Sequence, residues 1–166
     1  MKYLTSRFGK IALEEKDILF LPKGILGFSQ LSKYVIIEKG EYDPFKWLQS
    51  VEDPDVAFVI VDPTLFFPNY KLEVNEKELE ELNFQHMKEL VIYVVVTVPP
   101  DPSQISADLL GPVVINSKNS LAKQVVMPNS PYTTKHYILD ELKKQLNRKR
   151  FAEEKKPLNE TIGRKE

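Results

Sequence analysis

The clearest structural signal in this chain is the sequence Phe45-Lys-Trp-Leu-Gln-Ser-Val-Glu-Asp-Pro-Asp-Val-Ala-Phe-Val-Ile-Val-Asp-Pro-Thr-Leu-Phe-Phe-Pro68. Two runs rich in β-branched and aromatic residues, 45–51 and 56–61, flank the acidic sequence Glu52-Asp53-Pro54-Asp55. Proline fixes φ at a turn position, and aspartate accepts hydrogen bonds from nearby backbone N–H groups. The pattern therefore predicts a β-hairpin with an acidic turn.

Further short runs of the same composition occur along the chain, separated by proline and glycine. They predict strands at 8–13, 18–21, 34–37, 90–98, 113–116 and 124–127, and the hairpin strands are predicted at 47–51 and 57–61. We expect the long apolar run 90–98 to be central. The fold class predicted is mainly β, an antiparallel barrel or sandwich.

Two helices complete the prediction. A short one begins after Asn75, with Leu79 and Leu82 on its apolar side. A second helix covers 137–150, and four apolar residues are spaced for one face that packs on the sheet: Ile138, Leu139, Leu142 and Leu146. We divide the chain into a β domain, 1–136, and a C-terminal helix with a charged, flexible tail, 137–166. We expect removal of residues 152–166 to leave the fold intact.

Composition narrows the function. The chain has 166 residues, no cysteine and two histidines, which excludes disulfides and thiolate metal sites and fits a reducing cytosol. The first residues, Met1-Lys-Tyr-Leu-Thr-Ser-Arg7, lack the apolar segment of a signal peptide, and no apolar run approaches the roughly 20 residues of a membrane-spanning helix. We expect a cytoplasmic protein that binds no membrane.

The charge is unevenly distributed. Residues 1–140 hold 14 Lys and Arg against 19 Asp and Glu, a net of −5, whereas residues 141–166 hold nine against five, a net of +4. An acidic body favours a basic partner over nucleic acid. The basic helix has no interleaved aromatic residues for base stacking, so we interpret it as a solvated face.

No catalytic or cofactor-binding motif is present. The two histidines, His86 and His136, have no acidic neighbours at metal-ligand spacing, and the chain has no nucleophile elbow or phosphate-binding loop. We expect His86 to lie on the surface. The Glu52–Asp55 carboxylates are better explained by turn capping than by a hard cation. The sequence predicts no enzyme, no cofactor and no metal.

The candidate binding residues therefore lie on the predicted turns and loops. Four Asp-Pro dipeptides, at 43, 53, 62 and 101, predict rigid turn openings suited to protein recognition. Phe66 and Phe67 lie between prolines, and we expect one of them to be an interface anchor. The candidates for a partner-binding surface are Glu52, Asp53, Asp55, Phe66, Phe67 and Asp101.

Four stretches also support a family assignment. They are Arg7-Phe-Gly-Lys-Ile11, Phe20-Leu-Pro-Lys-Gly-Ile-Leu-Gly-Phe28, Trp47-Leu-Gln-Ser50 with its following Asp-Pro, and Leu110-Gly-Pro-Val-Val-Ile-Asn-Ser117, and the similarity ends near Gln124-Val-Val-Met127. In this order and separation they resemble the family of the flagellar assembly factor FliW. The resemblance implies a small, non-enzymatic, cytoplasmic β protein that binds the RNA-binding regulator CsrA and, alternatively, flagellin.

The resemblance also implies a mechanism. The protein sequesters CsrA, which otherwise represses flagellin translation, and unassembled flagellin competes with CsrA by binding the same protein. From the residues alone, two other classes stay open. One is a nucleic-acid-binding barrel, which the acidic body disfavours. The other is a small-molecule-binding or enzymatic barrel, which the lack of a polar catalytic set disfavours.

Overall fold

The computed structural model describes residues 1–154. Its strands are β1 Lys2–Thr5, β2 Gly9–Ala12, β3 Leu19–Phe20, β4 Lys33–Ile37, β5 Lys46–Ser50, β6 Ala57–Val61, β7 Leu90–Thr97, β8 Ser106–Ala107, β9 Val113–Asn116, β10 Ala122–Gln124 and β11 His136–Tyr137. Its helices are α1 Glu76–Leu79 and α2 Ile138–Glu154, and short 3-10 turns lie at Glu15–Asp17, Gly40–Tyr42, Pro63–Leu65, Glu80–Leu82, Met87–Glu89 and Pro102–Gln104.

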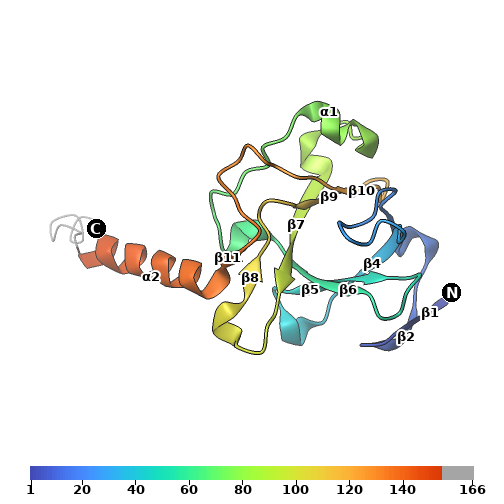
Figure 1. The fold of residues 1–166 in the computed structure, drawn as a ribbon, viewed down its shortest axis with the longest axis horizontal. Coiled ribbons are helices and arrows are strands. Elements are labelled where there is room, and N and C mark those ends of the chain that lie inside the picture. The colour runs from blue at the N-terminus through green and yellow to red at the C-terminus, as the bar shows by residue number, and fades with distance from the viewer. Residues whose placement is uncertain (155–166) are drawn as a thin grey trace, which may run out of the picture.

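One antiparallel sheet forms most of the molecule (Figure 1). Its strand order is β10-β9-β7-β6-β5-β4-β3, and β8 joins β7 to β11. The sheet curls until its two ends approach, where Phe20 N–H donates to Ser120 O at 2.9 Å. The predicted mainly β, barrel-like class is confirmed. The expected central position of the long apolar run is confirmed too, because β7 pairs with β6, β8 and β9.

The register of the predicted hairpin decides which side chains face outward. Trp47 pairs with Val59 and Gln49 pairs with Ala57, so these four residues share one face of β5 and β6. Leu48 and Ile60 alternate with them and point into the main core inside the curl. The face that carries Trp47 is the outer one.

Two separate segments cover this outer face. At one end the β1–β2 hairpin packs Phe8, Ile11 and Leu13 against Trp47 and its neighbours on β4. At the other end the start of α2 and the loops around it form a second cluster, which includes Ile138 and Phe66. Between the two covers the middle of β5 and β6 stays partly open.

The C-terminal helix differs from its prediction. Ile138 is buried and Leu142 packs against the second cluster, but Leu139 and Leu146 are exposed, Leu146 by 63%. After its first turns α2 leaves the body and projects from it (Figure 1), so the distal leucines have no sheet beneath them. The prediction of one face packed along the sheet is wrong beyond Leu142. The expected flexible tail, 155–166, lies outside the described residues, and the truncation at 152–166 falls mostly there.

The acidic helix is shorter than its sequence signal. α1 has a single turn and continues as the 3-10 turn at Glu80–Leu82, where Leu79 and Leu82 are buried against Val114 and Val125. Asn75 occupies the predicted N-cap position, but its side chain accepts no hydrogen bond there. Packing of the two leucines holds this segment in place.

Candidate functional site

The acidic turn between β5 and β6 is held by its own carboxylates. Glu52 Oε1 accepts backbone N–H bonds from Ser32 at 2.7 Å and Lys33 at 2.8 Å, and Asp53 Oδ1 accepts from Asp55 N–H at 3.0 Å. The Asp55 carboxylate accepts a hydrogen bond from the Ser6 hydroxyl on the β1–β2 turn. The predicted turn capping is confirmed. These carboxylates are surface charges with a structural role.

Asp101 plays a similar part in another loop. Its Oδ1 accepts from the Ser103 hydroxyl at 2.8 Å and from Ser103 N–H at 3.0 Å, which caps the 3-10 turn Pro102–Gln104. The hydroxyl bond and then the backbone bond hold the pKa of Asp101 below its usual value. Asp62 caps the turn at Pro63–Leu65 in the same way, with Thr64 N–H at 2.9 Å. Asp-Pro therefore opens rigid turns here, as the sequence predicts.

The two adjacent phenylalanines have different environments. Phe66 is 8% exposed and stacks on Phe45, with ring centroids 5.9 Å apart. Phe67 is half-buried, packs edge-on against His136 at 5.6 Å, and lines two shallow hollows beside α2. Phe66 is a core residue because its ring fills the space beside Phe45, so the expectation of an exposed anchor stays with Phe67 alone.

The sequence candidates do not form one surface. Glu52, Asp53 and Asp55 share the turn that precedes β6, whereas Phe66 and Phe67 follow the other end of that five-residue strand. At about 3.3 Å per residue the strand alone separates them by more than 15 Å. Asp101 lies in a third loop, between β7 and β8.

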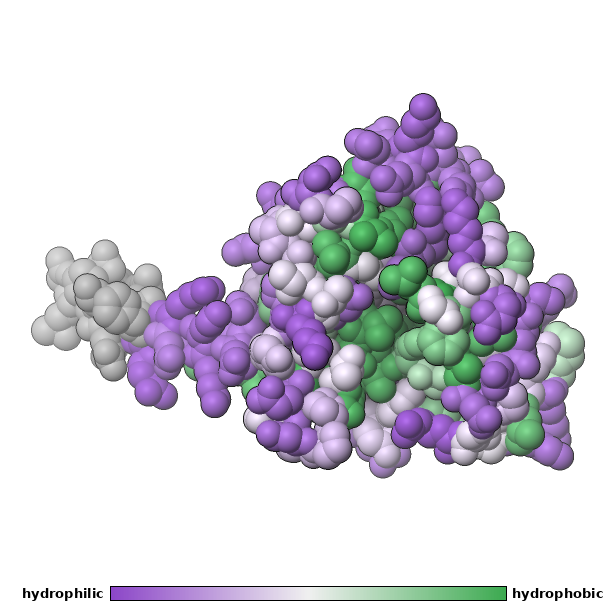
Figure 2. All heavy atoms as spheres, viewed as in Figure 1, coloured by the Kyte–Doolittle hydropathy of each residue, from purple (hydrophilic) through white to green (hydrophobic). Residues whose placement is uncertain are grey.

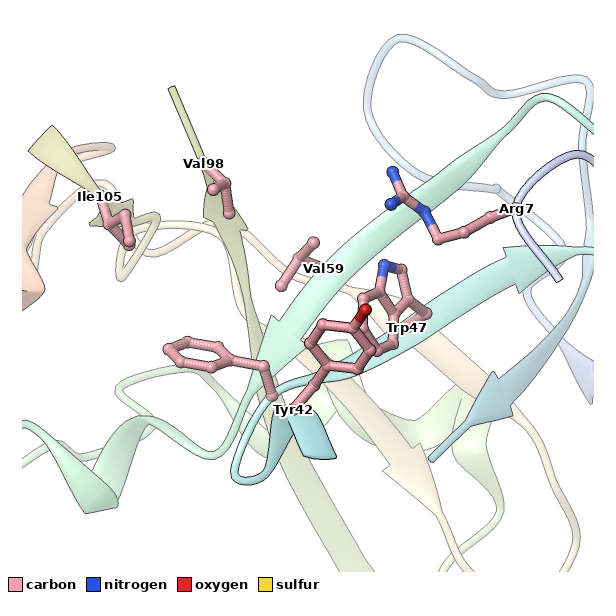
Figure 3. A pocket seen from close by; sticks show the side chains of 7 residues that line it. Arg7, Tyr42, Trp47, Val59, Val98 and Ile105 are labelled. Carbon is pink, nitrogen blue, oxygen red and sulfur yellow. The ribbon is translucent and has the colours of Figure 1, made fainter. Parts of the chain in front are cut away.

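A groove in the outer face brings together residues that the candidate set does not contain (Figure 3). It has a volume of about 380 Å³ and lies between the two covers of β5 and β6. Its lining residues are Arg7, Tyr42, Phe45, Trp47, Val59, Val98 and Ile105. A second hollow of about 330 Å³ continues it and shares Arg7, with Gln49 and Asp55 in its wall. Figure 2 shows apolar side chains gathered over the hollowed middle of one face of the body, with a polar α2 beside it.

One residue that lines the groove, Trp47, and one that lines the adjoining hollow, Gln49, contain buried polar atoms without partners. Trp47 Nε1 and Gln49 Oε1 have no hydrogen-bond partner in residues 1–154, although Trp47 is only 6% exposed and Gln49 is fully buried. The Gln49 amide is well oriented, because its Nε2 donates to Ser50 O at 3.0 Å and to Pro54 O at 3.2 Å. Nearly all buried polar groups in proteins are paired, so two orphans on one strand point to a binding surface.

Part of this groove follows from the sequence pattern. The alternation along β5 places Phe45, Trp47 and Gln49 on one face, and the structure agrees. The contributions of Arg7, Val98 and Ile105 come from distant segments that only the fold brings together. No spacing in the sequence signals their convergence.

A metal-ligand cluster and a membrane-spanning helix are both absent from the described part of the chain. Its residues contain no group of three His, Asp or Glu side chains placed to hold a metal ion. Across the same residues, no helix is both long and apolar enough to span a membrane.

Comparison with known proteins assigns the family. The family model described as FliW protein matches residues 2–138. The chain belongs to the FliW family. The flagellar assembly factor FliW of Thermoanaerobacter pseudethanolicus is 40% identical over 144 residues, which cover 86% of this chain and 96% of the relative. That of Geobacter sulfurreducens is 43% identical over 141 residues, covering 85% and 88%.

A solved structure agrees with this assignment. The crystal structure of the flagellar assembly factor FliW superposes with a TM-score of 0.78 at 36% identity, covering 83% of this chain and 96% of that one. The FliW match includes the acidic turn and the whole outer groove, and it ends at the first residue of α2.

Proposed function

We propose that this protein is a cytoplasmic flagellar assembly factor that acts by binding proteins and catalyses no reaction. The observation that carries the proposal is the match of residues 2–138 to the FliW family, with relatives named flagellar assembly factors at about 40% identity. Its partners are CsrA and, alternatively, flagellin. Binding of CsrA by the factor relieves repression of flagellin translation. Flagellin that accumulates before assembly binds the factor in turn and displaces CsrA from it.

The acidic turns are the proposed contact for CsrA. Glu52, Asp53 and Asp55 lie on a turn that hydrogen bonds hold rigid, so their charges are presented at a low cost in ordering. Asp101 adds a charge on a second capped turn, and Phe67 is the proposed apolar anchor at the other end of β6. A net charge of −5 over residues 1–140 supports a basic partner.

Calorimetry with purified CsrA and purified flagellin tests the proposal. We expect each to bind, and we expect saturating flagellin to abolish the heat of CsrA binding. If neither protein binds at tens of micromolar, the proposed function is wrong. If both bind at once without interference, the alternative-partner mechanism is wrong while the binding role stands.

Amide variants test the acidic turn without removing its capping. Asp53→Asn with Asp55→Asn keeps an acceptor oxygen at each position and removes two charges. We expect weaker CsrA binding, mostly through a slower and less salt-dependent association. The matched control is Glu15→Gln with Asp17→Asn on an exposed turn before β3, where Asp17 also accepts a backbone bond, from Glu14 at 2.9 Å. Equal affinities of both double variants would exclude this turn.

A further inference from the structure

The groove on the outer face combines an apolar wall with unpaired hydrogen-bonding groups. The wall consists of Phe45, Val59, Val98 and Ile105, and Val98 at its rim is 58% exposed. Such an apolar hollow with a few convergent polar groups is the usual form of a binding site.

Two donors converge at one end of this groove. The Arg7 guanidinium lies 5.8 Å from the centroid of the Trp47 ring, and in Figure 3 both side chains face the same space. Arg7 is exposed and makes no ion pair with any other side chain in residues 1–150. Trp47 Nε1–H is a donor without an acceptor. A positive charge beside an unpaired N–H is suited to a carboxylate.

The neighbouring groups decide where the carboxylate can lie. Asp55, in the wall of the adjoining hollow, accepts a hydrogen bond from the Ser6 hydroxyl, but its charge opposes a second carboxylate there, so the bound acid belongs at the Trp47 end. The Tyr42 ring packs edge-on against Trp47 at 4.8 Å, and together with Arg7 it covers the indole edge. Both covering side chains are exposed, so a change of rotamer opens the indole N–H.

The spacing of the orphan atoms indicates an extended chain. Trp47 and Gln49 lie two residues apart on β5, which places their Cα atoms about 6.6–6.8 Å apart. Groups on one side of an extended peptide repeat at the same interval. A peptide lying along β5 can therefore offer an acceptor to Trp47 and, once the exposed Arg7 side chain that lines both hollows has moved aside, a backbone N–H to the buried Gln49 Oε1.

We propose that the outer groove binds an extended peptide segment of a partner protein in which an acidic side chain adjoins an aliphatic or aromatic one. The apolar side chain fills the hollow beside Phe45 and Val59. The carboxylate accepts hydrogen bonds from Arg7 and from Trp47 Nε1–H, and a peptide N–H donates to Gln49 Oε1. This site has the opposite charge preference to the acidic turns, and it does not depend on the identity of the partners proposed above.

Selection from random peptides tests the chemistry directly. A displayed library of internal 12-residue random segments, which have no free C-terminus, is selected on the full chain. We expect enrichment of Asp or Glu next to Leu, Ile, Val or Phe. Recovery of no peptide, or of peptides without this pairing, would overturn the proposal. Enrichment only in a parallel library with free C-termini would overturn the assignment to an acidic side chain.

Charge variants locate the site. Arg7→Gln should weaken binding of the enriched peptide about tenfold, the usual effect of losing a charge-assisted contact. Lys10→Gln removes a positive charge that is also exposed and lies on the same hairpin but outside the groove, so it should change affinity less than about twofold. Equal effects of the two variants would contradict the proposed role of Arg7.

Rim variants test the apolar wall with a matched pair. Val98→Asp places a negative charge in the groove, and Val126→Asp does so at another exposed valine, 47% exposed, outside it. We expect the first to abolish peptide binding and the second to leave it unchanged, with both proteins folded by circular dichroism. Unchanged binding by Val98→Asp would place the peptide elsewhere.

Trp47 supplies a spectroscopic readout, since it is the only tryptophan of the chain. Its single indole ¹H–¹⁵N signal should move downfield when the synthetic enriched peptide is added. The same peptide with Asn or Gln in place of its acid should shift the signal less at equal saturation. An indole signal that stays in place while the peptide binds would exclude contact with Trp47 Nε1.

Discussion

Two buried tyrosines show how the environment of one hydroxyl decides its effect on stability. Tyr70 Oη donates to Leu109 O at 2.9 Å, whereas Tyr34 Oη is buried without a partner in residues 1–154. Burial, together with the nearby Glu52 charge, raises the pKa of Tyr34 to about 12. Burial likewise raises the pKa of Tyr70. Both hydroxyls therefore stay protonated at neutral pH.

Phenylalanine variants should separate these two hydroxyls. Tyr70→Phe leaves a buried carbonyl unpaired and should lower the free energy of unfolding by about 1–2 kcal/mol. Tyr34→Phe removes an unsatisfied hydroxyl and should leave stability unchanged or raise it by up to about 1 kcal/mol. Urea unfolding monitored by Trp47 fluorescence measures both. A larger loss for Tyr34→Phe than for Tyr70→Phe would show that the Tyr34 hydroxyl has a partner in solution.

His136 gives the fold a pH dependence. Its Nε2 accepts the Thr133 N–H at 2.9 Å, which requires the neutral ring. Burial lowers the pKa of His136 below the ordinary 6.5; the Glu141 and Asp108 carboxylates oppose the shift and Lys144 adds to it. Above 6.5 both folded and unfolded states hold a neutral ring. As the pH falls below 6.5 the unfolded state binds a proton first, so stability decreases.

We therefore expect the wild-type melting temperature to fall between about pH 8 and pH 5.5 by more than that of His136→Gln, since glutamine keeps an acceptor and does not titrate. His86→Gln is the control, because His86 is exposed, as its sequence position predicts. Asp108 acts in the opposite direction at lower pH, because burial raises its pKa and the folded state then gains stability as it binds a proton. Equal losses in wild type and His136→Gln would exclude this histidine as the cause.

At the scale of single residues, the sequence predicted hydrogen bonds between neighbouring residues better than contacts between residues far apart in the chain. Asp53, Asp62 and Asp101 cap turns as their Asp-Pro context indicates, because an Asx turn involves neighbours in the chain. The burial of Phe66 and the position of Arg7 over Trp47 depend on segments far apart in sequence. No local pattern carries that information.

At the scale of elements, α2 is held by its first turns. Leu142 packs on the cluster around Ile138, and the Gln145 side chain donates to Phe66 O. Leu142→Ala should lower the free energy of unfolding by about 1–2 kcal/mol, less than the 2–5 kcal/mol typical of a fully buried leucine.

Leu146→Ala is the matched control on the same helix, and it should stay within about 0.5 kcal/mol of wild type because the side chain is exposed. Chemical denaturation of the three proteins under one condition gives the comparison. A loss at Leu146 as large as that at Leu142 would mean that the distal helix contacts another surface in solution.

The predicted strands differ from the observed ones in an instructive way. The two runs 57–61 and 113–116 have the predicted bounds, because all but one residue in each is β-branched or aromatic. β1, β8 and β11 have no counterpart among the predicted strands. The last two have only two residues each, and they form because β7 offers an edge to β8, which then pairs with β11. Pairing of this kind is a property of the fold and leaves no composition signal.

At the scale of the whole molecule, the negative charge of residues 1–140 suggests how the proposed binding of CsrA would inhibit RNA binding by CsrA. A net charge of −5 over residues 1–140, docked on CsrA, opposes RNA phosphates at a distance, and salt screens the effect. We expect that excess RNA does not restore full RNA binding in the presence of the factor, and that higher salt partly relieves the inhibition. Fluorescence-anisotropy titrations at two ionic strengths measure both.

Complete rescue by RNA at every ionic strength would indicate steric occlusion of the RNA site instead. A charge-neutral control protein of the same size, added at the same concentration, accounts for crowding. A gel shift that shows RNA bound to the factor alone would support the alternative that this protein is a nucleic-acid-binding barrel.

The projection of α2 has an electrical consequence for how the molecule approaches a partner. A 17-residue helix is about 25 Å long, about three times the screening length of physiological salt. The helix carries the basic residues Lys143, Lys144, Arg148, Lys149 and Arg150. Lys144 and Arg148 still line hollows beside the body, and Lys149 and Arg150 lie further out along the projecting helix. The molecule is a permanent dipole, and the field of a charged partner exerts a torque on it before any surfaces touch. Encounters with a basic partner are turned body-first, and those with an acidic partner helix-first.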